Sequence, residues 1–151
     1  MIHVTRKVDL PEDFSLKKIR RIAGEVFKVM KISGDASIVF TDNNEIQYLN
    51  NVYREIDSST DVLSFLSDEI DPETNYRYLG DVIISVEKAV TQSNQAHHSL
   101  EDELTMLIVH GCLHLSGLDH SNPDEKKVMK EKQETILMKL QVGDYAWPED
   151  Y

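Results

Sequence analysis

The chain has 151 residues, a net charge of −11 and a single cysteine, which suits one domain and excludes an internal disulfide framework. The acidic balance argues against a broad phosphate-binding surface, because nonspecific affinity for nucleic acid comes mainly from lysine and arginine. Since no apolar stretch has the length of a signal peptide or a membrane span, we expect a soluble cytoplasmic protein with no membrane contact.

The first fifty residues predict a strand, a helix, a second strand and the start of another helix. Residues 2–8 alternate loosely between apolar and polar side chains and indicate a strand. Residues 15–31 carry apolar side chains at helical spacing after a capping serine. Residues 36–40 are rich in β-formers, and Asp42 with Glu45 three positions later resembles a capping box.

The middle of the chain predicts two strands and a helix. Residues 51–61 are polar and predict a loop, whereas residues 62–65 predict a short strand. Residues 68–77 are turn-like, and residues 79–86 are the most strongly β-like segment of the chain. Residues 87–97 favour a polar helix.

The last third of the chain predicts two longer helices. Residues 99–114 begin with a capping serine and are apolar nearly all round before two histidines, which indicates a buried helix. Residues 122–140 begin with Asn-Pro-Asp-Glu, a combination of cap, first-turn proline and acidic side chains that marks a helix start. We expect His97 and His98, before the first of these helices, to be exposed to solvent.

Strands and helices are interspersed along the chain without regular βαβ alternation. No internal repeat, low-complexity segment or linker divides the sequence. We therefore expect one α+β domain over residues 1–151, in which a small mixed sheet packs with several helices around the central histidine-bearing helix.

Three of the six histidines lie between residues 110 and 120. His110 and His114 are four residues apart, so they stand one turn apart on the same helix face and can point at one ion. Gly117 tolerates a left-handed backbone and can fold the chain back until His120 meets the pair. Three imidazoles without a fourth side chain is the ligand count of a catalytic zinc, which predicts one Zn²⁺ per chain.

The spacing His-x-x-x-His-x-x-Gly-x-x-His is the ligand frame of the metzincin proteases. Those enzymes place a glutamate directly after the first histidine as general base, but this chain has Gly111. A zinc-dependent peptidase or amidohydrolase therefore stays open as an alternative that the missing base disfavours. Histidines that merely pair with backbone carbonyls in the core are a second alternative.

Three sequence blocks together resemble the YbeY family of bacterial endoribonucleases, also called rRNA maturation factors. The first is Tyr53-Arg54 followed by Thr60-Asp61-Val62-Leu63-Ser64-Phe65, the second is Leu79-Gly80-Asp81, and the third is the histidine stretch with its Gly-x-Asp-His ending. The resemblance runs from about residue 50 to residue 124, and the blocks occur in the order of the family. It departs from the family at Ser59 and Leu66, where relatives often have proline.

This resemblance implies a zinc-dependent, single-strand-specific endoribonuclease. It implies action in rRNA maturation, notably at the three-prime end of the small-subunit 16S rRNA, and in ribosome quality control. The zinc ligands of the family fall on His110, His114 and His120, and its functionally important arginine falls on Arg54. Because the chain is acidic, we expect small-subunit ribosomal proteins or RNA-processing factors to help deliver the RNA. A non-enzymatic ribosome-associated factor with a structural zinc is a further alternative.

The predicted ligands are neutral, so the charge of the zinc would stay largely uncompensated and the pKa of a zinc-bound water could fall to about 7. That zinc-bound water is the expected source of hydroxide, either as the attacking group or as the base that deprotonates the RNA 2′-hydroxyl. The sequence leaves both routes open.

The expected task of Arg54 is to bind a substrate phosphate through two hydrogen bonds and to offset charge in the transition state. Its alternative is a surface salt bridge with Glu55 or Asp57. Asp119 and Asp81 are candidates to orient the ligand imidazoles, with capping or turn stabilisation as an equally open role for each.

Overall fold

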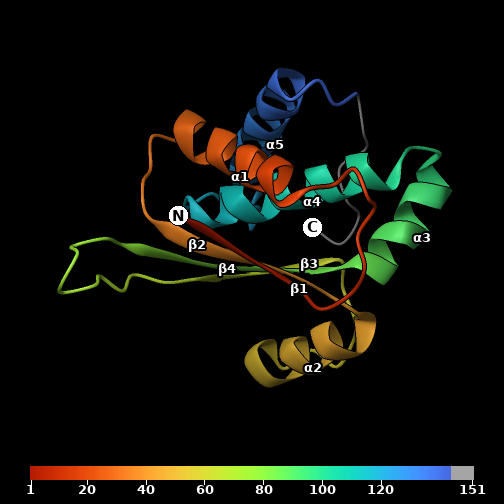
Figure 1. Ribbon diagram of the computed structural model, residues 1–151, viewed down its shortest axis with the longest axis horizontal. Coiled ribbons are helices and arrows are strands. Elements are labelled where there is room, and N and C mark those ends of the chain that lie inside the picture. The colour runs from red at the N-terminus through yellow and green to blue at the C-terminus, as the bar shows by residue number, and fades with distance from the viewer. Residues whose placement is uncertain (144–151) are drawn as a thin grey trace.

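Four strands and five helices make up residues 1–143, the part of the chain that the computed structural model describes (Figure 1). Their bounds are β1 Ile2–Arg6, α1 Leu16–Val29, β2 Asp35–Thr41, α2 Asn43–Arg54, β3 Val62–Leu66, β4 Tyr78–Ser85, α3 Val86–Ala96, α4 Leu100–Leu115 and α5 Pro123–Lys139. The expected order of strands and helices is confirmed. Over the same residues, no helix is both long and apolar enough to cross a bilayer.

Side-chain caps fix where the helices begin. At each of the five starts, a side-chain oxygen accepts the backbone N–H three positions further along; the capping residues are Ser15, Asp42, Ser85, Ser99 and Asn122. Such a cap satisfies a donor that the helix itself cannot pair and stabilises the fold by about 1 kcal/mol.

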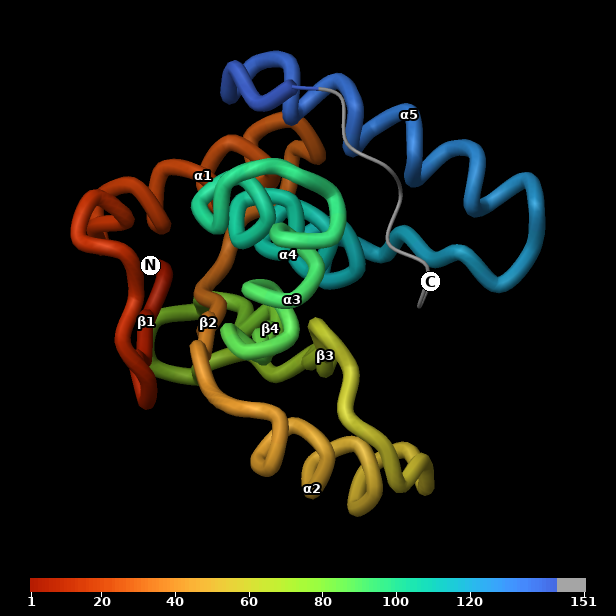
Figure 2. The backbone as a smooth tube through the Cα atoms, turned by 90° about the vertical axis from the view of Figure 1, so that its right-hand side faces the viewer, coloured from red at the N-terminus to blue at the C-terminus, as the bar shows by residue number. Residues whose placement is uncertain are grey.

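The strands form one mixed sheet in the order β1-β2-β4-β3. The strands β1, β2 and β4 are parallel, whereas β3 runs antiparallel to β4 at one edge. Helices α1, α4 and α5 lie on one side of this sheet and α2 lies on the other (Figure 2). The expected α+β fold with a small mixed sheet is therefore confirmed.

The helix α4 is the centre of the core. It packs on α1, α3 and α5 and on the strands β3 and β4. The apolar run at residues 104–109 is buried on every side, as expected for a helix without a polar face. Any side chain that α4 presents at its C-terminal end is consequently held by the whole core.

The helix α2 extends further than the sequence predicted. We expected a loop from residue 51, but the helix continues to Arg54 and ends at Glu55, whose φ is +59°. The residues after Asn50 are exposed, so their polar side chains face water within the helix. Arg54 is therefore held in the last turn of a helix and not in a loop.

A second expectation was wrong at His98. Its side chain is only 10% exposed, and its Nε2 lies 2.9 Å from Oε1 of the buried Glu103. Burial raises the pKa of Glu103, and the neighbouring His98 opposes that rise. The two residues are five positions apart, so the pair itself is local, but its burial was not evident from the local sequence. His97, by contrast, is exposed as expected.

Gly111 allows α4 to lie directly on the sheet. A Cβ at this position would lie 2.5 Å from Cγ1 of Val82 on β4 and 3.3 Å from Oγ of Ser64 on β3. Val82 is β-branched and fully buried, so it has little freedom to withdraw. A larger residue at position 111 must push the helix away from the sheet.

We predict that Gly111→Ala lowers the free energy of unfolding by about 1–3 kcal/mol, the usual cost of overpacking a tight core. The matched control is Gly24→Ala in α1, where no atom lies within 4 Å of the new Cβ. That change should be neutral or should stabilise the protein by about 0.5–1 kcal/mol. Chemical denaturation measures both, and equal stabilities of the two variants would contradict the packing account.

Candidate metal centre

Three histidines converge at the C-terminal end of α4. His110 and His114 project from the same face of the helix, one turn apart. At Gly117, with a φ of +99°, the chain turns back and returns His120 toward them. One ligand atom from each imidazole lies within 4.8 Å of the other two. The geometry predicted from the spacing of the histidines is therefore present.

The arrangement of the ring nitrogens fits a zinc ion. Nε2 of His110 lies 3.2 Å from Nε2 of His114. Two ligands of a tetrahedral zinc, each at about 2.0–2.1 Å from the ion, are separated by about 3.3 Å. The pair is already spaced as such ligands are, and all three rings lie close together.

Gln133 on α5 orients the first of these imidazoles. Its Oε1 lies 3.0 Å from Nδ1 of His110, and both side chains are buried. An amide oxygen accepts a hydrogen bond, so Nδ1 carries the proton and the lone pair of Nε2 faces the other histidines. Gln133 was not predicted as a site residue from the sequence. The sequence feature that could have identified it is a polar side chain at helical spacing from the apolar Met129 and Ile136, on the inward face of α5.

The buried imidazoles are neutral. Burial lowers the pKa of His110 well below its ordinary value, and the neighbouring His114 lowers it further. Burial also lowers the pKa of His114 to about 4, with a further contribution from His120. Neutral nitrogens bind metal ions without first losing a proton, so the site is ready for a metal near pH 7.

Asp119 supports the returning turn. Its Oδ1 accepts the backbone N–H of His120 at 2.7 Å, and its Oδ2 accepts the hydroxyl of Ser121 at 2.8 Å. These two hydrogen bonds lower the pKa of the carboxyl group. The carboxylate thus positions the backbone of His120, which is the turn-stabilising role that the sequence left open.

Asp81 lies away from the histidines. Its carboxylate accepts a hydrogen bond from the hydroxyl of Tyr78. Successive side chains of a strand alternate between the two faces of a sheet, and the next residue, Val82, faces α4. Asp81 therefore belongs to the opposite face, so the expectation that it orients a ligand imidazole is corrected.

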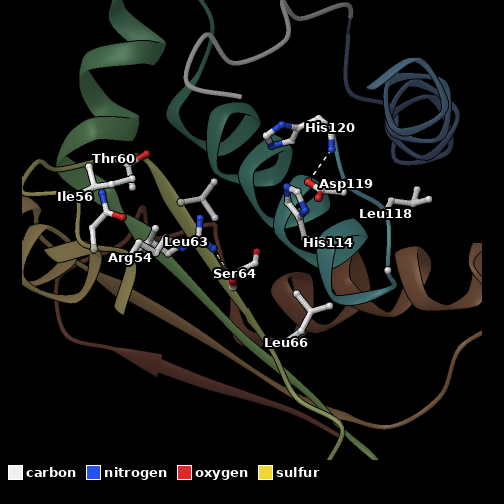
Figure 3. A pocket seen from close by; sticks show the side chains of 13 residues that line it. Arg54, Ile56, Thr60, Leu63, Ser64, Leu66, His114, Leu118, Asp119 and His120 are labelled. Carbon is white, nitrogen blue, oxygen red and sulfur yellow. Dashed lines mark hydrogen bonds between the residues drawn. The ribbon is translucent and has the colours of Figure 1, made fainter. Parts of the chain in front are cut away.

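Arg54 stands across a pocket from the histidines (Figure 3). The pocket has a volume of about 450 Å³, and Arg54, His114 and His120 all line it. Nη2 of Arg54 donates to the backbone carbonyl of Ser64 at 2.8 Å. Within residues 1–143 no salt bridge joins Arg54 to Glu55 or Asp57, so the surface pairing considered above is not formed.

Comparison with known proteins identifies related sequences. A family model described as Endoribonuclease YbeY matches residues 3–141. The chain is 40% identical over 133 residues to the endoribonuclease YbeY of Syntrophomonas wolfei, covering 82% of this chain and 85% of that protein. It is 50% identical over 109 residues to the endoribonuclease YbeY of Carboxydothermus hydrogenoformans, covering 72% and 73%.

A solved structure shares the fold. The solution structure of a protein from Thermotoga maritima matches with a TM-score of 0.59 over 93% of this chain and 92% of that chain. The two sequences are 20% identical, so the likeness concerns the fold alone.

We predict that Gln133→Leu weakens metal binding by about 10- to 100-fold, the usual effect of losing the hydrogen bond that orients a ligand histidine. Gln133→Glu keeps an acceptor oxygen and should retain most of the affinity. Isothermal titration of the metal-free variants with zinc measures both. Equal affinities of wild type and Gln133→Leu would show that Gln133 does not orient His110.

The metal-free protein should lose stability as the pH falls from about 6.5 toward 4. The unfolded chain binds protons at histidine near pH 6.5, whereas the folded protein holds His114 neutral down to about pH 4. The contribution of His114 to stability is therefore fully present above about pH 6.5, declines as the pH falls across this range, and is lost below about pH 4. Denaturation of wild type and His114→Gln across this range provides the measurement; the same slope in both would contradict the assignment.

Proposed function

Because the chain belongs to the Endoribonuclease YbeY family, we propose that it is a zinc-dependent endoribonuclease that cleaves single-stranded RNA. In this proposal His110, His114 and His120 hold the metal, and Arg54 binds the phosphate. The observation that carries it is the placement of three converging imidazoles opposite a guanidinium without a carboxylate partner in the described part of the chain.

Different residues of the site have different tasks in the proposed reaction. When bound, a divalent ion supplies Lewis acidity toward a phosphate oxygen and a source of hydroxide near neutral pH. Gln133 and the turn at Asp119 keep the imidazoles in place for it. Arg54 offers a planar fork of donors to the phosphate oxygens, and its bond to Ser64 fixes where that fork lies.

Peptide hydrolysis is disfavoured by the space around position 111. A metzincin protease carries its glutamate base there, but in this chain even a Cβ would lie 2.5 Å from Val82. The chain therefore has neither the base nor room for it.

The edge strand β3 gives a second argument against a peptide substrate. Extended peptides bind by pairing with the outward backbone groups of an edge strand. Here the Val62 N–H donates to Oδ1 of Asp61, and the Ser64 carbonyl accepts from Arg54. Side chains of the protein thus occupy two of the positions that a peptide strand would use.

A purely structural zinc is disfavoured by the openness of the site. Structural zinc sites close their coordination with a fourth protein ligand, whereas catalytic sites leave one position for solvent or substrate. Among the described residues, the cluster has three histidines, two of which line the pocket shared with Arg54.

We propose rRNA as the physiological substrate, including the three-prime end of the small-subunit 16S rRNA, with a further role in ribosome quality control in the cytoplasm. Family membership supports this assignment. Because a charge of −11 disfavours unassisted binding to RNA, small-subunit ribosomal proteins or RNA-processing factors are the proposed partners. A pull-down without any such partner would count against them.

Two substitutions separate metal binding from phosphate binding. His114→Ala should lose both zinc and cleavage, because it removes a ligand. Arg54→Glu should keep zinc but lower the cleavage rate by about 10²–10³-fold or more, as loss of a transition-state donor does. The matched control is Arg21→Glu on the exposed surface of α1, which changes the net charge equally.

Zinc analysis and cleavage of single-stranded and duplex RNA measure these effects, and identification of the cleaved ends distinguishes the two routes of attack. If Arg54→Glu cleaved single-stranded RNA as fast as Arg21→Glu, the role of Arg54 would be wrong. Turnover of unstructured peptide without cleavage of RNA would instead favour the peptidase.

A further inference from the structure

An exposed aromatic ring lies beside Arg54 on α2. Tyr53 is 67% exposed. Its ring packs against Phe65 of β3, with the centroids 5.4 Å apart and the planes at 62°. Cζ of Arg54 lies 5.6 Å from the centroid of the same Phe65 ring. We call the rings of Tyr53 and Phe65, together with the adjacent guanidinium of Arg54, the aromatic surface.

The aromatic surface adjoins the pocket at the edge strand β3, and Arg54 belongs to both. Arg54 lines the pocket and contacts the ring of Phe65. Ser64 and Leu66 line the pocket, so the alternation of side chains along β3 places Phe65, which lies between them, on the opposite face of the strand. Figure 3 shows Ser64 between Arg54 and His114. A nucleic-acid strand whose phosphate is bound by Arg54, and which continues past the edge of the sheet at β3, therefore reaches the ring of Tyr53.

The charge of the protein makes such a surface useful. A chain with a net charge of −11 gains little from general attraction to phosphates. Stacking of bases on aromatic rings requires no net charge and tolerates any base. The contact with Phe65 holds the Tyr53 ring in place, so less side-chain freedom is lost when a base binds.

We propose that Tyr53 stacks on an unpaired nucleobase adjacent to the phosphate that Arg54 binds. This inference rests on the proposed function and adds the residue that selects for single strands. A base inside a duplex has both of its faces covered by its neighbours, whereas an unpaired base can offer one face to Tyr53. Tyr53 is thus a substrate-binding residue and takes no part in the chemical step.

The first test uses the zinc-loaded protein and a short single-stranded RNA. Tyr53→Leu should raise KM by about 5- to 150-fold, the range expected for loss of one stacked base, with kcat within about twofold of wild type. Tyr53→Trp should keep or lower KM. Tyr48→Leu is the matched control, because Tyr48 is 65% exposed on the same helix but points about 140° away around its axis.

The second test removes the base instead of the ring. RNAs with one abasic nucleotide at successive positions should include one whose KM for wild type is raised and for which Tyr53→Leu has no further effect. The salt dependence of KM should be the same for wild type and Tyr53→Leu, because stacking displaces no counterions.

Each outcome has a distinct meaning. An unchanged KM for Tyr53→Leu would overturn the stacking role while leaving the nuclease in place. The same holds if Tyr53→Leu raises KM by the same further factor at every abasic position. A fall in kcat with KM unchanged would also overturn it, because the residue would then act on the chemical step. Absence of RNA cleavage by the zinc-loaded wild type would overturn the proposed function itself.

Discussion

The close contact between α4 and the sheet fixes the relative positions of the residues at the site. Gly111 lies against Val82 with no room for a side chain, so the helix is pressed onto β4 and β3. This contact sets how α4 is rotated about its axis and therefore where His110 and His114 point. It also brings the histidine face of α4 level with the edge strand, where Arg54 bonds to Ser64. The three histidines and Arg54 thus share one rigid frame.

Burial gives the site its electrostatic character. Desolvation keeps His110 and His114 neutral by lowering the pKa of each, so the charge of a bound divalent ion would not be offset by its ligands. Arg54 adds a second positive group on the opposite wall of the same pocket. An acidic protein can in this way attract one phosphate to a local positive site while repelling polyanions elsewhere. In our proposal, further affinity for RNA comes from stacking on Tyr53 and from partner proteins.

The extent to which the sequence predicted this structure depended on whether the determining contacts were local. The histidine frame follows from helical periodicity and one left-handed glycine, so the sequence placed it correctly. The hydrogen bond of Gln133 to His110 joins residues 23 positions apart and needed the packing of α5 on α4. The burial of His98 against Glu103 likewise arose from tertiary packing. The last turn of α2, which carries Arg54, was missed because polar, exposed residues are compatible with both a loop and a helix. Of the two roles left open for Asp81, contact with a ligand imidazole is disfavoured by the strand register, which places it on the face of the sheet away from α4.

The most direct test of the account is to titrate zinc into the metal-free protein while following both bound metal and the rate of cleavage of single-stranded RNA. We predict that the rate rises in proportion to bound zinc and levels off at one ion per chain, with the protein folded throughout. A rate that is independent of bound metal would contradict the catalytic role of the three histidines. Folding that appears only when zinc binds would point to the structural role instead.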